Sequence, residues 1–179
     1  MKAYHFVGET LKDGRPIPAD GEWLVHAGEI IPCQSGLHAS VEPFDALTYA
    51  PGATLCLVAL EGDLVANGND KWVGRRRKIL KRFDATCVLR RFAADQALST
   101  KHLWDMPTIV EEYLTTLDAT KRNAARYAAL DVAYDAAQAA VYAAYAAAVY
   151  ADAWVAARNA ALDAARSDFN KRIEKELKE

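Results

Sequence analysis

Glycine and proline are confined to the first part of the chain. All nine glycines lie at or before Gly74, and all six prolines lie at or before Pro107. Because these residue types interrupt helices, residues 108–179 can form helix without a break. We therefore predict an α+β fold, in which a small N-terminal mixed-sheet domain is followed by helices and a long alanine-rich helical tail. The expected boundaries are residues 1–92 for the α+β domain, 93–118 for short linking helices and 119–179 for the tail.

Short apolar runs between turn residues predict the elements of the N-terminal domain. Short apolar runs indicate strands at 3–7, 22–26, 29–32 and 53–65. Residues 71–83 fit a strand or a helix, and we favour a strand that ends at Asp84. Ala27-Gly28 is expected to form a tight turn between the second and third of these strands. Helices are expected at 43–47, from 85 to about 98 and after Pro107, with Asp84 and Asp118 as N-caps.

Alanine dominates the tail. Residues 119–169 contain 23 alanines in 51 positions, without glycine or proline, and this composition predicts helix. A single helix of about sixty residues would be roughly 90 Å long, so the tail either folds back as a hairpin or projects and finds partners. Apolar residues recur at every seventh position, as in a coiled coil: Tyr127, Tyr134, Val141, Ala148, Val155, Leu162 and Phe169. We therefore expect a homo-oligomer assembled through the tail.

Composition argues against several classes of protein. The formal net charge is −2, so no global charge favours nucleic acid or a membrane surface. The three cysteines and four histidines show no spacing typical of a metal site. The longest uncharged run, 136–151, is too short and too weakly apolar to span a bilayer, and the N-terminus lacks an apolar signal core. We expect a cytoplasmic protein that uses no metal and no cofactor.

Basic residues are concentrated at the end of the N-terminal domain. Residues 71–91 carry nine Lys or Arg and one acid, Asp84. Guanidinium and ammonium groups bind phosphate, so a candidate ligand site consists of four consecutive residues: Arg75, Arg76, Arg77 and Lys78. The alternative is a solvated surface, or pairing with the acidic residues of the helical half. Nucleic acid is not favoured as the ligand, because the interleaved aromatic residues of single-strand binders are missing.

His38 and three aromatic residues of the tail are further candidates. His38 follows a turn and precedes a helix, a position from which a side chain can reach a cleft; alternatively, its imidazole bonds a backbone group within the fold. In the tail, Tyr142, Tyr145 and Trp154 lie among alanines. In an assembly, flat rings bordered by small residues form slots suited to a base or another aromatic ligand. The alternative is ordinary core packing, and no residue is assigned a catalytic role on these grounds.

A motif in the first half of the chain marks a resemblance to a known family. Its residues are Cys33-x-x-Gly36-Leu37-His38-Ala39-Ser40-x-x-Pro43-x-Asp45-Ala46-Leu47-x-Tyr49-Ala50, then Leu57-x-x-Leu60-Glu61-Gly62-Asp63 and the run Arg75–Lys78. Over residues 2–92 the chain resembles an uncharacterised family of small proteins from phages and prophage regions. Its members join such a domain to an alanine-rich tail with an Asn-x-x-hydrophobic-acidic ending, here Asn170 to Glu174. The resemblance implies a phage accessory protein and no assigned reaction.

The order of motifs is also similar to that of ADP-ribosyltransferases of the diphtheria-toxin type. Those enzymes use an early His, a Tyr in the following helical region and a late Glu, which the likeness places at His5, Tyr49 and, as the near candidate, Glu61. The chain departs from their pattern after His5, where Phe-Val-Gly replaces a Gly followed by Ser or Thr. The likeness implies an NAD-using transferase in which His5, His38 and Tyr49 are essential.

Taken together, these features favour a non-enzymatic protein. We expect a phage accessory protein that binds and sequesters a phosphate-bearing small molecule, such as a nucleotide signal of host defence. The basic run and the aromatic tail would hold this ligand. Two alternatives stay open: a protein–protein inhibitor or adaptor that acts through the helical tail, and the ADP-ribosyltransferase-like enzyme.

Overall fold

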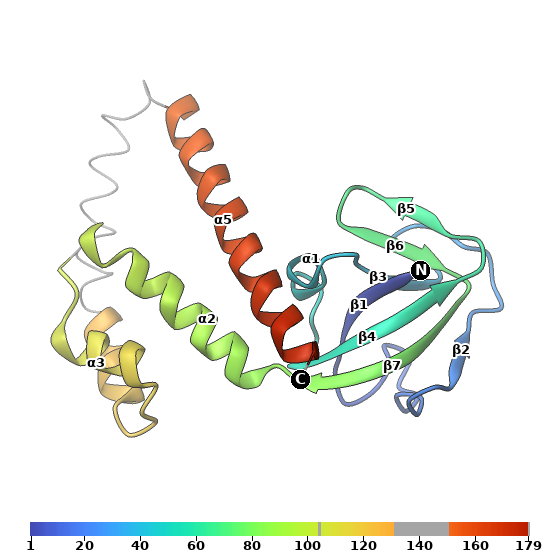
Figure 1. Ribbon diagram of the computed structural model, residues 1–179, viewed down its shortest axis with the longest axis horizontal. Helices are drawn as coiled ribbons and strands as arrows, with labels where there is room; N and C mark the ends of the chain where they lie inside the picture. The colour runs from blue at the N-terminus through green and yellow to red at the C-terminus, as the bar shows by residue number, and fades with distance from the viewer. Residues whose placement is uncertain (104, 131–150, 179) are drawn as a thin grey trace. The chain divides into compact units, whose positions relative to one another are not determined.

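The residues that the structure describes form seven strands, with one short helix among them, and then a series of helices, which confirms the predicted α+β fold (Figure 1). The computed structural model describes residues 1–103, 105–130 and 151–178, without the side chains of 103, 151–158 and 161. The strands are β1 (Lys2–Val7), β2 (Trp23–Val25), β3 (Leu37–Ala39), β4 (Thr54–Glu61), β5 (Val65–Asn67), β6 (Lys71–Gly74) and β7 (Arg76–Asp84). The helices are α1 (Pro43–Leu47), α2 (Thr86–Ser99), α3 (Thr108–Thr116) and α5 (Ala151–Lys178), with a 3-10 turn at Lys101–Leu103.

The chain divides into two compact units. The first is Met1–Val88 together with the end of the chain from Asp168 onward, and the second is Leu89–Ser167. The first unit contains two antiparallel sheets, one of four strands in the order β1-β4-β7-β2 and one of three strands in the order β3-β6-β5. A bridge between Tyr4 of β1 and Ser40, just after β3, joins the two sheets through a pair of backbone hydrogen bonds of 2.7 and 2.9 Å.

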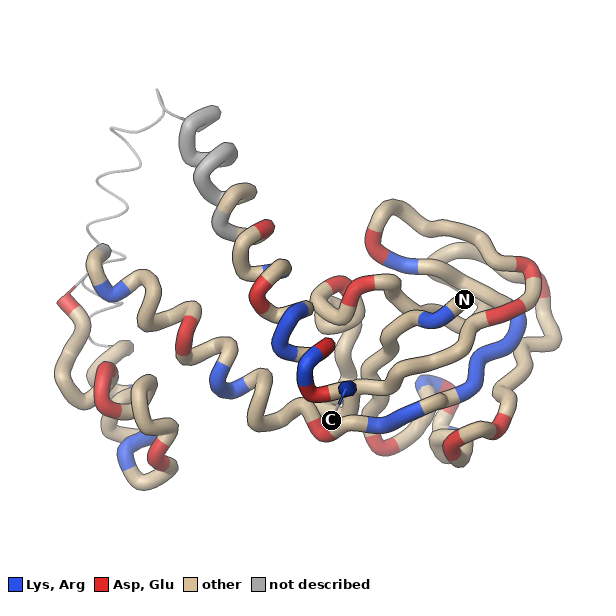
Figure 2. Tube along the Cα trace, in the orientation of Figure 1, with Lys and Arg blue, Asp and Glu red and all other residues tan. Residues whose placement is uncertain are grey.

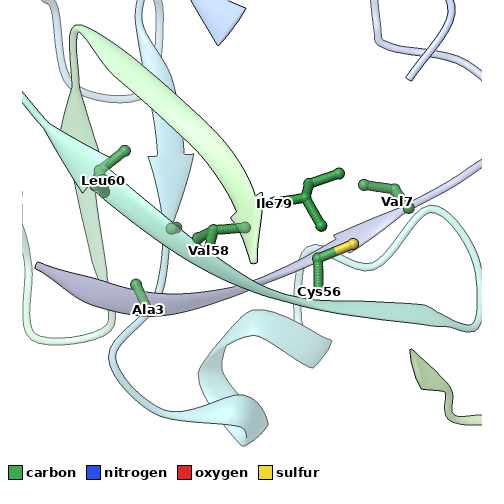
Figure 3. Packing of buried hydrophobic residues seen from close by; sticks show 7 residues of the cluster. Ala3, Val7, Cys56, Val58, Leu60 and Ile79 are labelled. Atoms are coloured by element: carbon green, nitrogen blue, oxygen red, sulfur yellow. The ribbon is translucent and has the colours of Figure 1, made fainter. Parts of the chain in front are cut away.

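The core of the first unit lies around β4. Cys56, Val58 and Leu60 alternate along one face of β4 and are fully buried, and Leu55, which pairs with the buried Phe6 of β1, is fully buried on the other face. The register shift opposite Leu57 and Val58 leaves Leu80 of β7 as the extra residue, as in a β-bulge. Figure 3 shows the β4 side chains packed with residues of β1 and β7. Burying each large aliphatic side chain contributes about 1.5–3 kcal/mol, so this central strand anchors the unit.

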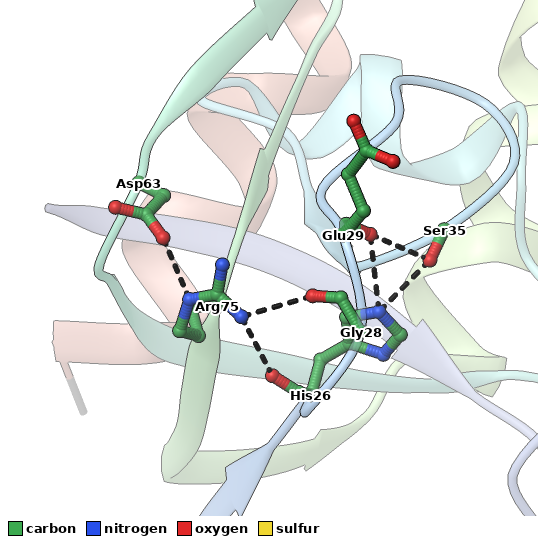
Figure 4. A network of polar contacts seen from close by, with 6 residues as sticks. All are labelled: His26, Gly28, Glu29, Ser35, Asp63 and Arg75. Atoms are coloured by element: carbon green, nitrogen blue, oxygen red, sulfur yellow. Dashed lines mark hydrogen bonds and ion pairs between the residues drawn. The ribbon is translucent and has the colours of Figure 1, made fainter.

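Two strand predictions were wrong. Residues 29–32 form no strand, and β2 pairs with β7 instead of with them. The backbone groups of His26 that a hairpin would use are bonded to Arg75 instead: the N–H of His26 donates to the carbonyl of Arg75 at 2.8 Å, and the guanidinium of Arg75 donates to the carbonyl of His26 (Figure 4). The predicted strand 71–83 is two strands, because the chain turns at Arg75 from the three-stranded into the four-stranded sheet.

The helix predicted to follow Asp84 is confirmed, whereas the helix of the tail begins later than expected. The Oδ1 atom of Asp84 accepts the backbone N–H of Thr86, the first residue of α2, at 2.9 Å and so satisfies a donor that the first turn leaves unpaired. Oδ1 of Asp118 accepts the N–H of Thr120 at 2.9 Å, but this contact lies in the turn before the tail helix, which begins at residue 122. In the second unit, the guanidinium of Arg91 binds Asp95 and donates to the backbone carbonyls at the end of α3.

The tail is helical at 122–130 and 151–178, as its composition predicts. Of the apolar positions repeated every seven residues, Tyr127 and Leu162 are exposed, whereas Phe169 is fully buried within the first unit. The heptad positions 134, 141 and 148 lie outside the described residues, as does the side chain at 155. Assembly through the tail therefore stays a prediction. Among the described helices, none is both long and apolar enough to cross a membrane.

Candidate functional site

A cavity of about 360 Å³ lies in the first unit, between the two sheets and α1. We call it the histidine cavity. Strands β1, β3 and β6, the short helix α1 and the loops between them all contribute to it. Its lining residues are Tyr4, His5, Lys12, Cys33, Gln34, Gly36, His38, Ala39, Ser40, Ala46, Tyr49 and Lys71.

Glycine at position 36 lets the chain form one wall of the cavity. Gly36 has a φ of +117°, a conformation that residues with a side chain rarely adopt. A Cβ atom there would lie 2.4 Å from Cγ2 of Val73, inside van der Waals contact. The wall that carries His38 therefore depends on a residue without a side chain.

Two neutral imidazoles belong to this cavity. Burial, followed by the nearby charges of Arg77 and His38, holds the pKa of His5 well below 6.5. Burial and the charges of Lys71 and Arg77 also lower the pKa of His38. The Nε2 atom of His38 is buried and has no hydrogen-bond partner among the described residues. Because a buried polar atom is usually paired, this nitrogen is an unsatisfied hydrogen-bonding group in a residue of the cavity wall, donor or acceptor according to its tautomer.

Tyr49 and Lys71 form a second wall. The Tyr49 hydroxyl donates to Oδ2 of Asp70, and this hydrogen bond raises the pKa of the phenol. The Lys71 ammonium lies 4.1 Å from the centre of the Tyr49 ring, within the range of a cation–π contact. Burial alone would lower the pKa of Lys71, but contacts with Cys33 and Tyr49 outweigh it and the pKa is raised. Lys71 is therefore a fixed positive charge.

Cys33 places an activated thiol at the same cavity. Its backbone has a φ of +65°, and its side chain is exposed. The Nδ2 atom of Asn67 donates to its Sγ atom at 2.9 Å. This hydrogen bond, together with the neighbouring Lys71, lowers the pKa of the thiol, which favours the thiolate, the reactive form of cysteine.

The electrostatic character of the cavity is positive. Lys12 and Lys71 are its two cationic side chains, and none of the lining residues that the structure describes is Asp or Glu. The imidazoles add hydrogen-bonding groups without charge. Also, no group of three His, Cys, Asp or Glu within the described ranges is placed to hold a metal ion. The arrangement suits an anion that also has groups able to form hydrogen bonds.

Comparison with protein families places the cavity in a known domain. A family model described as a domain of unknown function, DUF7666, matches residues 1–91, just over half of the 179 residues. The chain belongs to this family. Every residue that lines the histidine cavity falls within the DUF7666 match. No curated protein matches the chain, and no solved structure does.

The basic run of the DUF7666 domain lies apart from the cavity lining, along the start of β7 (Figure 2). Arg75 binds Asp63 at 2.6 Å and the two carbonyls described above (Figure 4). Arg76 pairs with Glu61 at 2.7 Å. Arg76 and Lys78 both lie over the ring of Trp23, at 4.9 and 4.7 Å from its centre. These three basic residues thus have partners within the domain, and their binding of a ligand stays a prediction.

Arg77 is buried next to the cavity wall and holds the backbone of His38. Its side chain is only 7% exposed, and its Nη1 atom donates to the backbone carbonyl of His38. Burial lowers the pKa of this guanidinium to about 10, so it remains charged at neutral pH. It also borders a smaller hollow next to His5. Arg77 thus fixes the backbone of His38 from a position that is not part of the cavity surface.

Of the eight predicted binding residues of this DUF7666 protein, His38 alone lines the histidine cavity. Tyr142 and Tyr145 lie outside the described residues, as does the side chain of Trp154. The sequence analysis did not select Lys12 or Lys71 as binding residues. The motif that begins at Cys33 was the signal that could have located the cavity, because its Cys, Gly, His, Ala and Ser residues all line it.

Proposed function

We propose that the DUF7666 domain of this protein binds a phosphate-bearing small molecule in the histidine cavity. The observation that carries the proposal is the charge of the lining: Lys12 and Lys71 are present, and no described lining residue is acidic. Charge-assisted hydrogen bonds from ammonium groups to phosphate are among the stronger polar contacts in proteins. The site would therefore favour anions and disfavour cations.

The size of the cavity and the side chains of its walls restrict the class of ligand further. A volume of about 360 Å³ falls in the range of sites for small organic molecules. The phenol of Tyr49 and the imidazoles of His5 and His38 offer flat surfaces and hydrogen-bonding groups of the kind that accept a heteroaromatic ring. A mononucleotide or a compound of similar size combines both features. We therefore place nucleotides first among the phosphate compounds.

Retention of the ligand is favoured over its conversion. A transferase of the type that the motif order resembles needs a late carboxylate, and Glu61 instead pairs with Arg76 and does not line the cavity. Sequestration of a nucleotide signal of host defence, by a phage accessory protein, is the biological role that we propose. It rests on this cavity and on the resemblance to phage proteins.

The test is a comparison of two lysine variants. Inorganic phosphate, adenosine monophosphate and cyclic dinucleotides are titrated into the protein by calorimetry, and bound material is recovered after denaturation. Lys71→Met should weaken binding about tenfold, the loss of one charge-assisted contact. Lys78→Met removes a lysine of the basic run and should leave binding unchanged. The opposite result would move the site to the basic run, and no binding by the wild type would end the proposal.

A transferase activity is the second candidate, because one observation favours it. His5, His38 and Tyr49, which the likeness to ADP-ribosyltransferases selects, line the same cavity. Incubation with NAD decides between the two: free nicotinamide, absent with His5→Gln and Tyr49→Phe, would establish turnover. Recovery of NAD unchanged supports retention.

An adaptor role is supported by the helices. Tyr127 and Leu130 on one helix and Leu162 on α5 are large apolar side chains that are 46–67% exposed. Such residues are available to a second copy of the chain or to a protein partner. Native mass spectrometry of the wild type and of a Leu162→Glu variant tests self-assembly, since a charge at a heptad position should dissociate an oligomer.

A further inference from the structure

The end of α5 packs into the first unit. Phe169 and Ile173 are fully buried there, although they lie far outside the DUF7666 match. The ring of Phe169 meets that of Phe44 edge to face, with 5.8 Å between their centres. Lys81 of β7 also donates to the backbone carbonyl of Leu177, at 2.9 Å. This C-terminal segment, residues 168–178, is thus part of the fold of the unit that contains the cavity.

Asn170 makes the most specific contacts of the C-terminal segment. Its Oδ1 atom accepts the backbone N–H of Phe44 at 2.8 Å, and its Nδ2 atom donates to the carboxylate of Glu42. Asn170 is itself 9% exposed. Both of its partners are at the start of α1, more than a hundred residues earlier in the chain.

These contacts replace a missing helix cap. Glu42 is the N-cap residue of α1, yet its side chain makes no capping hydrogen bond. An N-cap side chain normally accepts the N–H of the second or third helical residue. Phe44 is the second residue of α1, because Pro43 is the first. The amide of Asn170 therefore supplies the cap, and α1 needs it, since a helix of five residues has little stability of its own.

Helix α1 and the turn that follows it carry two of the residues that line the histidine cavity. Ala46 lines the cavity from within the helix, and Tyr49 lines it from the turn that follows. The backbone N–H of Tyr49 donates to the carbonyl of Ala46 at 3.1 Å, so the last turn of α1 sets the place of the phenol. Tyr4, across the cavity, has a raised pKa owing to burial and then to the charges of Glu174 and Glu42. The C-terminal segment thus acts electrostatically on the cavity as well.

We propose that Asn170 is a positioning residue for the histidine cavity, because it caps α1 and so holds Tyr49 and Ala46 in the wall. The unit that binds ligand is then the DUF7666 domain together with the C-terminal segment. Docking of the segment and occupation of the cavity are linked, and each favours the other by the same factor. The ligand part of this inference rests on the proposed function, whereas the capping part does not.

The variants follow from the two hydrogen bonds of Asn170. Asn170→Ala removes both. Asn170→Asp keeps an acceptor for the N–H of Phe44 but faces the carboxylate of Glu42. The double variant Glu42→Gln with Asn170→Asp exchanges the amide and the carboxylate, and so restores a donor and an acceptor at each place. Asn159→Ala is the matched control, because Asn159 is an exposed asparagine on the same helix.

Two measurements are made on each variant. Amide hydrogen exchange of residues 44–50 needs no ligand and reports the cap and the turn after it. Calorimetry with adenosine monophosphate reports the cavity. Asn170→Ala should raise exchange across 44–50 about fivefold, the typical effect of a lost N-cap, and should weaken binding of the nucleotide about threefold to tenfold. The double variant should recover both properties, and Asn159→Ala should change neither.

The outcomes separate this inference from the proposed function. If Asn170→Ala raises exchange at Phe44 alone and leaves residues 46–50 and nucleotide affinity as in the wild type, Asn170 is a structural cap only and the inference is overturned. If the wild type binds no nucleotide, the proposed function fails, and exchange at 46–50 still decides whether Asn170 positions the wall. Should Asn170→Ala not fold, Asn170→Asp and the double variant give the same comparison, since recovery by the second change requires the pairing.

Discussion

The basic run and the histidine cavity use positive charge in opposite ways. In the basic run, neighbouring residues of the sequence carry the charge, and Arg75 and Arg76 bind carboxylates of the same domain. In the cavity, Lys12 and Lys71 are far apart in sequence, and no described lining residue is acidic. Charge density along the sequence therefore marks where a fold is held together, whereas an anion site needs cations that the fold leaves without acidic partners. Such cations are found only when the fold is known.

The largest expected effect concerns the cavity wall. Gly36→Ala should lower the free energy of unfolding by about 3 kcal/mol, because it adds a Cβ clash to an unfavourable φ. Gly14→Ala is the control: its φ is +83°, but its Cβ would meet nothing within 4 Å, so about 1 kcal/mol is expected. Urea denaturation measures both. Equal losses would mean that the wall adapts to a side chain.

Acid should destabilise the unit that contains the cavity, through the buried imidazole of His5. The pKa of His5 is lowered in the folded state, so below pH 6.5 the unfolded chain binds more protons. The contribution of such a histidine to the free energy of unfolding is therefore fully present above pH 6.5. It is lost as the pH falls, by up to about 1.4 kcal/mol per pH unit. Urea denaturation between about pH 5 and pH 8 measures the slope. His5→Gln should flatten it, and an unchanged slope would mean that the burial of His5 does not cause the loss of stability.

Substitution of Arg75 should lower the stability of the fold, whereas substitution of Lys71 should lower the affinity for the ligand. Arg75→Met should cost about 1 kcal/mol of unfolding free energy, because a partly exposed ion pair and two carbonyl contacts are lost. It should not change the affinity for phosphate compounds. Lys71→Met should do the reverse. Denaturation and calorimetry on both variants give the four values, and a loss of affinity with Arg75→Met would contradict the contrast drawn between the two regions.

The smallest effect concerns the thiols. Cys33 should react with iodoacetamide several-fold faster than Cys87 at neutral pH, because Asn67 and Lys71 lower its pKa. Both cysteines are exposed, so Cys87 is an internal reference. Mass spectrometry of peptides at successive times gives the two rates. Asn67→Ala should bring the rates closer together, and an unchanged ratio would mean that the contact does not activate the thiol.

Local signals predicted much of the fold. The strand at 3–7, the helix that begins at Pro43 and the contact of Asp84 with the start of α2 were predicted correctly, because each depends on residues close in sequence. Asp118 was expected to cap the tail helix, but that helix begins only at residue 122. The strand at 29–32 was wrong, and the N–H and carbonyl of His26 that would have closed its hairpin are bonded to Arg75, more than forty residues later. Contacts at such separations leave no trace in local periodicity.

The cavity was only partly predictable. His5, His38 and Tyr49 were selected together by motif order, and they do share a cavity. Lys71 belonged to a segment of nine basic residues in which nothing distinguished it from the others. Its distinction is geometric: His38 of β3 pairs with Val73 of β6, so Lys71, two residues before Val73, lies on the same face of the small sheet as His38. Asn170 was noted as part of the tail ending, but its role as a cap follows only from its position beside α1.

One residue, Arg75, separates β6 from β7, although these strands belong to different sheets. With a connection this short, the two sheets cannot rotate against each other without breaking strand pairing. The bridge between Tyr4 and Ser40 joins the same two sheets at a second place. The cavity walls on β1, β3 and β6 are therefore linked to one another through backbone at two points, and their spacing is set by the backbone more than by the loops.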